Sequence, residues 1–87
     1  MATFGQKLRE IRLKINFPQA RFAAIIGVSD TQYQRYEYDE SEPTLKVLKM
    51  ICHSFNVNAN YLLGLSDEVI LHPDNPYTAT TIPLPMD

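Results

Sequence analysis

Apolar residues recur every three or four positions along most of the chain, which is the pattern of amphipathic helices. The first expected helix starts after Thr3, a good N-cap, and ends near Asn16, a residue that tolerates the left-handed conformation at a helix end. Its apolar face consists of Phe4, Leu8, Ile11 and Ile15. This periodicity extends over residues 1–65 and is absent from residues 66–87.

Two further helices are expected on either side of Gly27, which permits a tight turn because glycine adopts positive φ without steric cost. The helix before the turn spans residues 19–26. The helix after it follows Ser29 and runs to about Tyr38. Ser29 and Gln32 have the spacing of a capping box, in which each side chain accepts from the other residue's backbone amide.

A polar loop at 39–43 precedes a fourth expected helix, for which Thr44 is the N-cap. Its apolar positions are Leu45, Leu48, Ile51, Cys52 and Phe55. A short fifth helix follows Asn58 and ends at Gly64. Because no segment of this part alternates clearly with period two, the sequence predicts an all-α domain of five helices.

The C-terminal stretch differs from the rest in composition. Residues 67–87 contain four prolines, which exclude a continuous helix. We therefore expect a domain at 1–66 and an extended tail or arm at 67–87. Such a segment is compatible with an unstructured terminus and with an arm that docks on a partner subunit.

Charge is unevenly distributed along the chain. Residues 1–36 hold six basic and two acidic residues, a net charge of +4, whereas residues 37–87 hold two basic and eight acidic residues, a net charge of −6. This asymmetry suggests a basic face that could meet an anion, although a solvated surface with segregated charges would look the same.

Several classes of function lack support in the sequence. Cys52 is the single cysteine and diverges from its neighbour His53 by about 100° around a helix, so neither a disulfide nor a metal site is expected. No catalytic arrangement or glycine-rich phosphate loop stands out, so we expect no enzyme and no cofactor. Without a signal peptide or an apolar run of about 18 residues, a cytoplasmic protein that contacts no membrane is expected.

Residues 19–37 hold the most informative pattern, two short helices joined by a glycine turn, which is how a helix-turn-helix is built. Ala23 is small where the third helix crosses the second, and Tyr33 and Tyr36 fall on the inner face of the third helix. Together with the stretches at 8–12 and 61–65, this segment resembles the helix-turn-helix of the phage repressor and Cro class, the XRE family. The resemblance covers residues 4–65.

The resemblance implies that the helix at about 30–38 lies in the major groove of DNA. The residues that it assigns to the reading of base edges are Asp30, Thr31, Gln34 and Arg35. It assigns phosphate contact to Gln19, at a helix N-terminus where the helix dipole favours an anion.

Two more assignments concern the first helix. Lys7 and Arg9 are either further phosphate contacts or part of a solvated face. Arg12 and Glu37 match the residues that form an ion pair in the family, a structural brace between the first helix and the recognition helix.

The polar loop departs from the family. Asp39, Glu40 and Glu42 stand where relatives often have basic residues or glycine against the DNA backbone. Acidic groups near phosphates weaken binding. Asp30 at the first base-reading position and Pro18 in place of a capping serine or threonine are also unusual.

The sequence therefore predicts a repressor-like transcriptional regulator that binds double-stranded DNA, as a homodimer formed through its C-terminal part. The alternative is a protein-binding module with the same fold, whose acidic loop at 39–42 has weakened or abolished DNA binding. A gel-shift titration at low salt separates these two.

Overall fold

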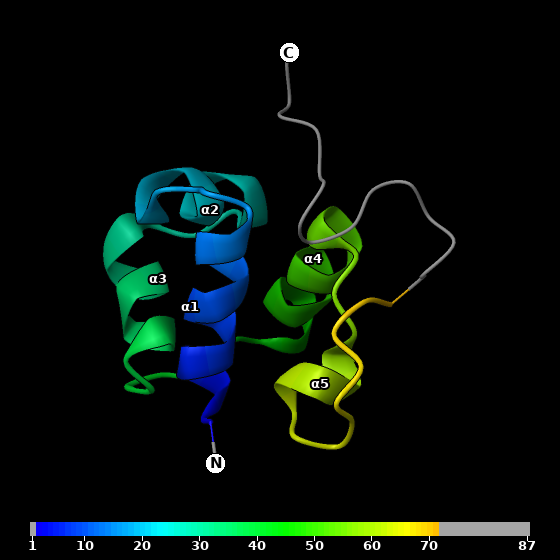
Figure 1. Cartoon of the computed structure of the whole chain (residues 1–87). Coiled ribbons are helices and arrows are strands. Elements are labelled where there is room, and N and C mark those ends of the chain that lie inside the picture. The colour runs from blue at the N-terminus through cyan, green and yellow to red at the C-terminus, as the bar shows by residue number, and fades with distance from the viewer. Residues whose placement is uncertain (1, 72–87) are drawn as a thin grey trace.

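The computed structural model describes residues 2–71, and within them the chain forms five α-helices (Figure 1). They are α1 (Phe4–Lys14), α2 (Gln19–Ile26), α3 (Asp30–Glu37), α4 (Leu45–Phe55) and α5 (Ala59–Leu62). In Figure 1, α1 stands beside α3, with α2 across one end and with α4 and α5 on the other side. The prediction of an all-α fold with five helices is confirmed. None of these helices is long and apolar enough to span a membrane.

The core lies where α1, α2, α3 and α4 meet. At its centre the Phe22 and Phe55 rings stack with their centroids 4.3 Å apart, and Tyr33 lies tilted against Phe22 at 5.0 Å. Tyr33 and Tyr36 are buried, as the periodicity of the third helix predicts. Burial of one such large side chain contributes about 1.5–3 kcal/mol, so the aromatic cluster fixes α3 against α2, and α2 against α4.

The helix ends follow the expected capping residues with one exception. Thr3 and Gln6 form a complete capping box at α1, and Asn16 and Asn56 adopt left-handed backbone angles after α1 and α4. At α3 the Ser29 hydroxyl caps the amide of Gln32. The predicted reciprocal bond is wrong, because the Gln32 side chain donates to the Ser41 hydroxyl (3.0 Å) in the loop after α3.

The expected apolar face of α4 needs a correction. Leu45 is 85% exposed, whereas Ile51, Cys52 and Phe55 are buried. The buried residues lie in the second half of the helix, which packs against α2 and α5. Leu45 is the first residue of α4 and keeps the helical spacing, but its side chain is left outside that contact.

Residues 67–71, the start of the expected tail, lie against the helical domain. The Asn58 amide donates to the Val69 carbonyl (2.7 Å), and the Leu71 amide donates to the Asn56 carbonyl (2.9 Å). Between these bonds, Val57 and Ile70 form an isolated antiparallel bridge. The remainder of the expected tail, residues 72–87, lies outside the described residues.

Candidate nucleic-acid interface

The relation of α2 to α3 depends on the turn at Gly27. This glycine has φ +80° at the end of α2, and the next amide, of Val28, bonds back to the Ala23 carbonyl (3.0 Å). Ser29 then caps α3 through its hydroxyl. Because the turn is closed on both sides by backbone and cap bonds, α3 starts in a defined direction relative to α2.

One side of α3 packs inward and the other faces solvent. The inner side consists of Tyr33, Tyr36 and Glu37, which are buried. The four residues expected to read bases are all exposed, and among residues 2–71 no hydrogen bond or ion pair restrains their side chains: Asp30, Thr31, Gln34 and Arg35. Tyr38 extends this surface at the end of the helix with 66% exposure, a residue that the sequence patterns did not single out.

Arg12 and Glu37 form a buried ion pair between α1 and the end of α3. Arg12 Nε lies 2.6 Å from Glu37 Oε2, and Nη2 lies 3.3 Å from Oε1. The remaining guanidinium nitrogen, Nη1, donates to the Phe17 carbonyl (2.8 Å). The Glu37 side chain is only 1% exposed, so the pair fixes α1, the connector before α2, and α3 relative to one another.

The same carboxylate also holds the residue expected to contact phosphate. Gln19 Nε2 donates to Glu37 Oε1 at 3.0 Å. Gln19 is the first residue of α2, whose N-cap, Pro18, makes no side-chain cap bond. The first amides of α2 therefore have no side-chain acceptor within the described part of the chain, and a bound anion would satisfy them.

The electrostatics of this network follow from its hydrogen bonds. Burial by itself raises the pKa of the Glu37 carboxyl, but the hydrogen bonds from Arg12 and Gln19 outweigh it and place that pKa below its ordinary value. The hydrogen bond with Glu37 in turn raises the pKa of Arg12. The pair is therefore ionised at neutral pH.

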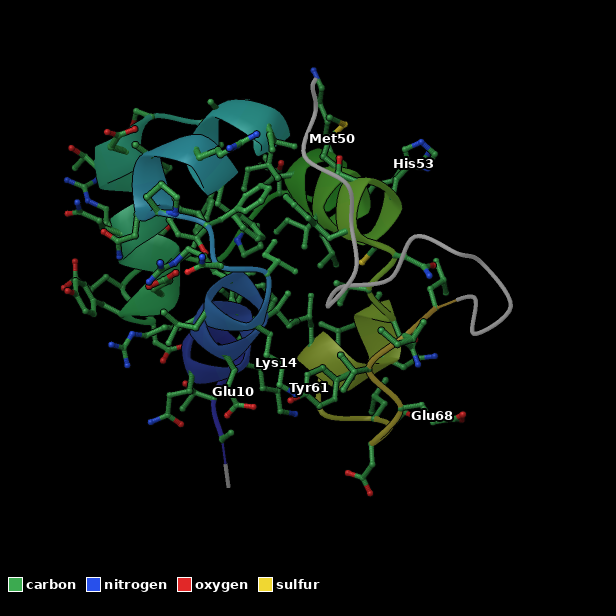
Figure 2. The ribbon with its side chains drawn as sticks, turned by 45° about the horizontal axis from the view of Figure 1, so that its top comes forward. Glu10, Lys14, Met50, His53, Tyr61 and Glu68 are labelled. Atoms are coloured by element: carbon green, nitrogen blue, oxygen red, sulfur yellow. The ribbon has the colours of Figure 1, made fainter. Side chains whose placement is uncertain are left out.

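The two basic residues assigned to α1 lie in different places. Lys7 Nζ donates to the Tyr61 carbonyl (2.9 Å) and lies 4.9 Å from the centre of the Tyr61 ring. Tyr61 comes from α5 (Figure 2), so the structure turns Lys7 towards α5 and does not bring it to α3. Arg9 is exposed, four residues after Gly5 on the face of α1 that approaches α3.

The acidic loop is less uniform than its sequence indicates. Asp39, Glu40 and Glu42 are all exposed, but the carboxylate of Asp39 is bonded to the start of α1. The expectation of three carboxylates facing a DNA backbone therefore needs a correction, because one of them is engaged within the domain. Between residues 2 and 71, no group of three or more potential ligands is placed to hold a metal ion.

Comparison with known proteins places this geometry in context. A family model described as helix-turn-helix (HTH_3) matches residues 8–62. An SPbeta prophage-derived HTH-type transcriptional regulator, YonR of Bacillus subtilis, is 32% identical over 60 residues, which are 69% of this chain and 56% of that protein. The cryptic phage CTXphi transcriptional repressor RstR of Vibrio cholerae is 36% identical over 59 residues, or 68% and 53% of the two chains. The chain thus spans about half the length of the curated relatives that it matches.

Among solved structures, the chain is similar to the P22 c2 repressor protein in complex with synthetic operator 9T. The TM-score is 0.71 and the sequence identity 26%, over 76% of this chain and all of that one. A solution structure of the DNA-binding domain of the same repressor gives a TM-score of 0.67, also at 26% identity, over 82% of this chain and 96% of that domain.

Proposed function

Because the chain belongs to the helix-turn-helix family HTH_3, we propose that it is a transcriptional regulator that recognises a specific sequence of double-stranded DNA. The family match confirms the resemblance to the phage repressor class. This is a family of transcriptional regulators and not of enzymes. The observation that carries the proposal is the exposed polar face of α3, on a domain similar in structure to an operator-bound repressor.

In this proposal α3 enters the major groove and its exposed side chains contact base edges. Arg35 has the planar fork that pairs with guanine O6 and N7, and Asp30 can accept from the amino group of cytosine. Thr31 and Gln34 lie on the same exposed face and complete the reading surface.

Phosphate contacts would come from the start of α2. The Gln19 amide group uses one hydrogen for Glu37, which leaves its second hydrogen for a phosphate oxygen. The uncapped amides of α2 point in the same direction along the helix axis and favour an anion through the helix dipole. Of the two basic residues assigned to α1, Arg9 is exposed and available for a phosphate contact, whereas Lys7 would first have to leave Tyr61.

A homodimer completes the proposal, because proteins of this kind bind paired half-sites with two-fold symmetry. Apolar side chains remain exposed after α5, where Leu63 is 55% and Leu65 is 75% exposed. Leu63 also borders a groove of about 480 Å³ with Leu45 and Leu48 of α4 and Phe4 of α1. A second copy of the chain that covered this region would bury these residues.

The experiment is a selection of binding sites from a randomised duplex pool at low salt, followed by affinity measurement on the selected sequence. A regulator enriches a defined sequence. The alternative function, a protein-binding module, is favoured by the exposed Glu40 and Glu42 beside the end of α3, which would repel a DNA backbone. A pool that shows no enrichment would support this alternative.

A further inference from the structure

We infer that Asp39 is a positioning residue that ties the end of α3 to the start of α1, and that DNA binding depends on this tie. The inference rests on the proposed function, because it concerns the placement of α3 on DNA. It assigns to Asp39 a role opposite to that of a repulsive surface acid.

The bonds of Asp39 reach across 34 and 36 positions of the sequence. Its Oδ1 accepts from the Gly5 amide at 2.9 Å, and its Oδ2 accepts from the Thr3 hydroxyl at 2.5 Å. The first turn of α1 contains no acidic residue of its own. Asp39 therefore supplies the negative charge that a helix N-terminus favours, from a different element of the fold.

The backbone of Asp39 is fixed by the end of α3. Its amide bonds to the Tyr36 carbonyl (3.2 Å), and the next amide, of Glu40, bonds back to the Arg35 carbonyl (2.9 Å). Asp39 also has φ +59°, a left-handed conformation that glycine adopts more easily. A side chain at this position is therefore strained relative to glycine, and the structure uses that side chain in two bonds.

The helices are closest to each other at the same point. A Cβ atom on Gly5 would lie 2.3 Å from the Glu37 carbonyl oxygen and 2.6 Å from that of Tyr36. The start of α1 thus packs directly on the last turn of α3. Asp39, two residues after that turn, bonds to Thr3 and Gly5 at the same contact. With the Arg12–Glu37 pair two turns further along α1, the recognition helix is held at two points.

This arrangement has a consequence for DNA binding. The exposed residues of α3 must reach base edges while Gln19 on α2 contacts the backbone, so the two helices have to keep one relative placement. When the tie at Asp39 is lost, the Arg12–Glu37 pair and the packing on Gly5 still hold the last turn of α3 to α1, but the placement of that turn becomes less uniform. Only the fraction of molecules with α3 correctly placed then binds, whatever the DNA sequence.

The test compares Asp39→Gly with Glu40→Gln by fluorescence anisotropy on a selected and a scrambled duplex, at a temperature where circular dichroism shows each variant folded. Asp39→Gly keeps the left-handed backbone and removes the carboxylate, and Glu40→Gln removes one exposed negative charge from the neighbouring residue. We expect Asp39→Gly to bind both duplexes about five- to tenfold more weakly than the wild type, with unchanged discrimination between them. Glu40→Gln should bind as tightly as the wild type or more tightly.

Equal or tighter binding by Asp39→Gly would overturn the inference, because Asp39 would then act as a surface acid. Asp39→Asn, which keeps an acceptor oxygen and tolerates the left-handed backbone, should restore part of the affinity, and it replaces Asp39→Gly in the comparison if that variant does not fold. Amide hydrogen exchange provides a readout without DNA. Faster amide exchange in Asp39→Gly than in the wild type at Gly5 and at the end of α3, with unchanged exchange in α4, supports the tie even if the wild type selects no DNA sequence. Unchanged exchange at Gly5 contradicts the tie.

Discussion

The Glu37 carboxylate is almost completely enclosed, and it accepts hydrogen bonds from Arg12 on α1 and Gln19 on α2. An ion taken out of water is stable in the fold only when its partners replace the lost hydration. The three side chains therefore act as a unit, and removal of one leaves the others with unsatisfied groups. This makes the pair sensitive to pH.

Glu37→Gln provides the test at the residue scale. Because the folded pKa of Glu37 lies below its ordinary value of 4.5, the stability that it contributes is present above pH 4.5 and is lost as the pH falls through the folded pKa. We expect Glu37→Gln to be less stable than the wild type at neutral pH, by less than the roughly 3–5 kcal/mol lost when a buried charge has no partner, since the amide still accepts from Arg12. Urea unfolding between pH 7 and pH 2.5 measures this. A stability difference that stays constant over that range would contradict an ionised, pH-sensitive pair.

The pairing of these two residues was predicted from the family spacing, whereas the bonds of Asp39 were not. In the sequence Asp39 belongs to a run of acidic loop residues, and nothing in its neighbours shows that α1 begins beside it. Contacts between residues more than thirty positions apart depend on the packing of α1 against α3. The contact of Lys7 with Tyr61 was not predicted for the same reason, since the two residues are 54 positions apart in the sequence.

At the scale of elements, the contact of α1 with α3 and the turn from α2 to α3 each require a glycine, for different reasons. Gly5 leaves room for the carbonyl groups at the end of α3, and Gly27 adopts positive φ with nothing within 4 Å of its missing Cβ. The first requirement is one of space and the second is one of backbone conformation.

Alanine substitutions separate these requirements. Gly27→Ala should lose about 1–2 kcal/mol through left-handed strain alone. Gly5→Ala forces two helices apart, so we expect a loss of roughly 1–3 kcal/mol or more together with weaker DNA binding. Chemical denaturation of both variants measures the losses. If Gly5→Ala is as stable as the wild type, the close approach of α1 and α3 is not a constraint on the fold.

The helices themselves were largely predictable, because periodicity and capping residues act locally. Thr3, Thr44 and Asn58 cap their helices as expected, and Gly27 ends α2. The outward position of Leu45 was not predictable in this way. Helical spacing defines a face, but which turns of that face are covered depends on where the neighbouring helices end.

For the whole molecule, self-association is the property on which the proposed mode of action depends. Leu65→Glu should shift the sedimentation coefficient towards that of a monomer, because a charge cannot be buried in an apolar contact without a partner. Leu13→Glu is the matched control, since Leu13 on α1 is also exposed, at 52%, but lies outside the proposed contact. Identical sedimentation of the wild type and Leu65→Glu would remove this region from the dimer.

Deletion of residues 72–87 tests the expected arm by the same sedimentation measurement.

The central claim, that α3 reads DNA sequence, is tested most directly by anisotropy titrations of the wild type, Arg35→Ala, and the double variant Glu40→Lys with Glu42→Lys. Arg35→Ala should lose about 1–3 kcal/mol on the selected duplex and lose discrimination at one base pair. The double lysine variant should bind selected and scrambled duplexes more tightly alike, with a steeper dependence on salt, because new phosphate contacts release more counterions. Equal affinity of the wild type for both duplexes at low salt, unchanged by Arg35→Ala, would contradict the account.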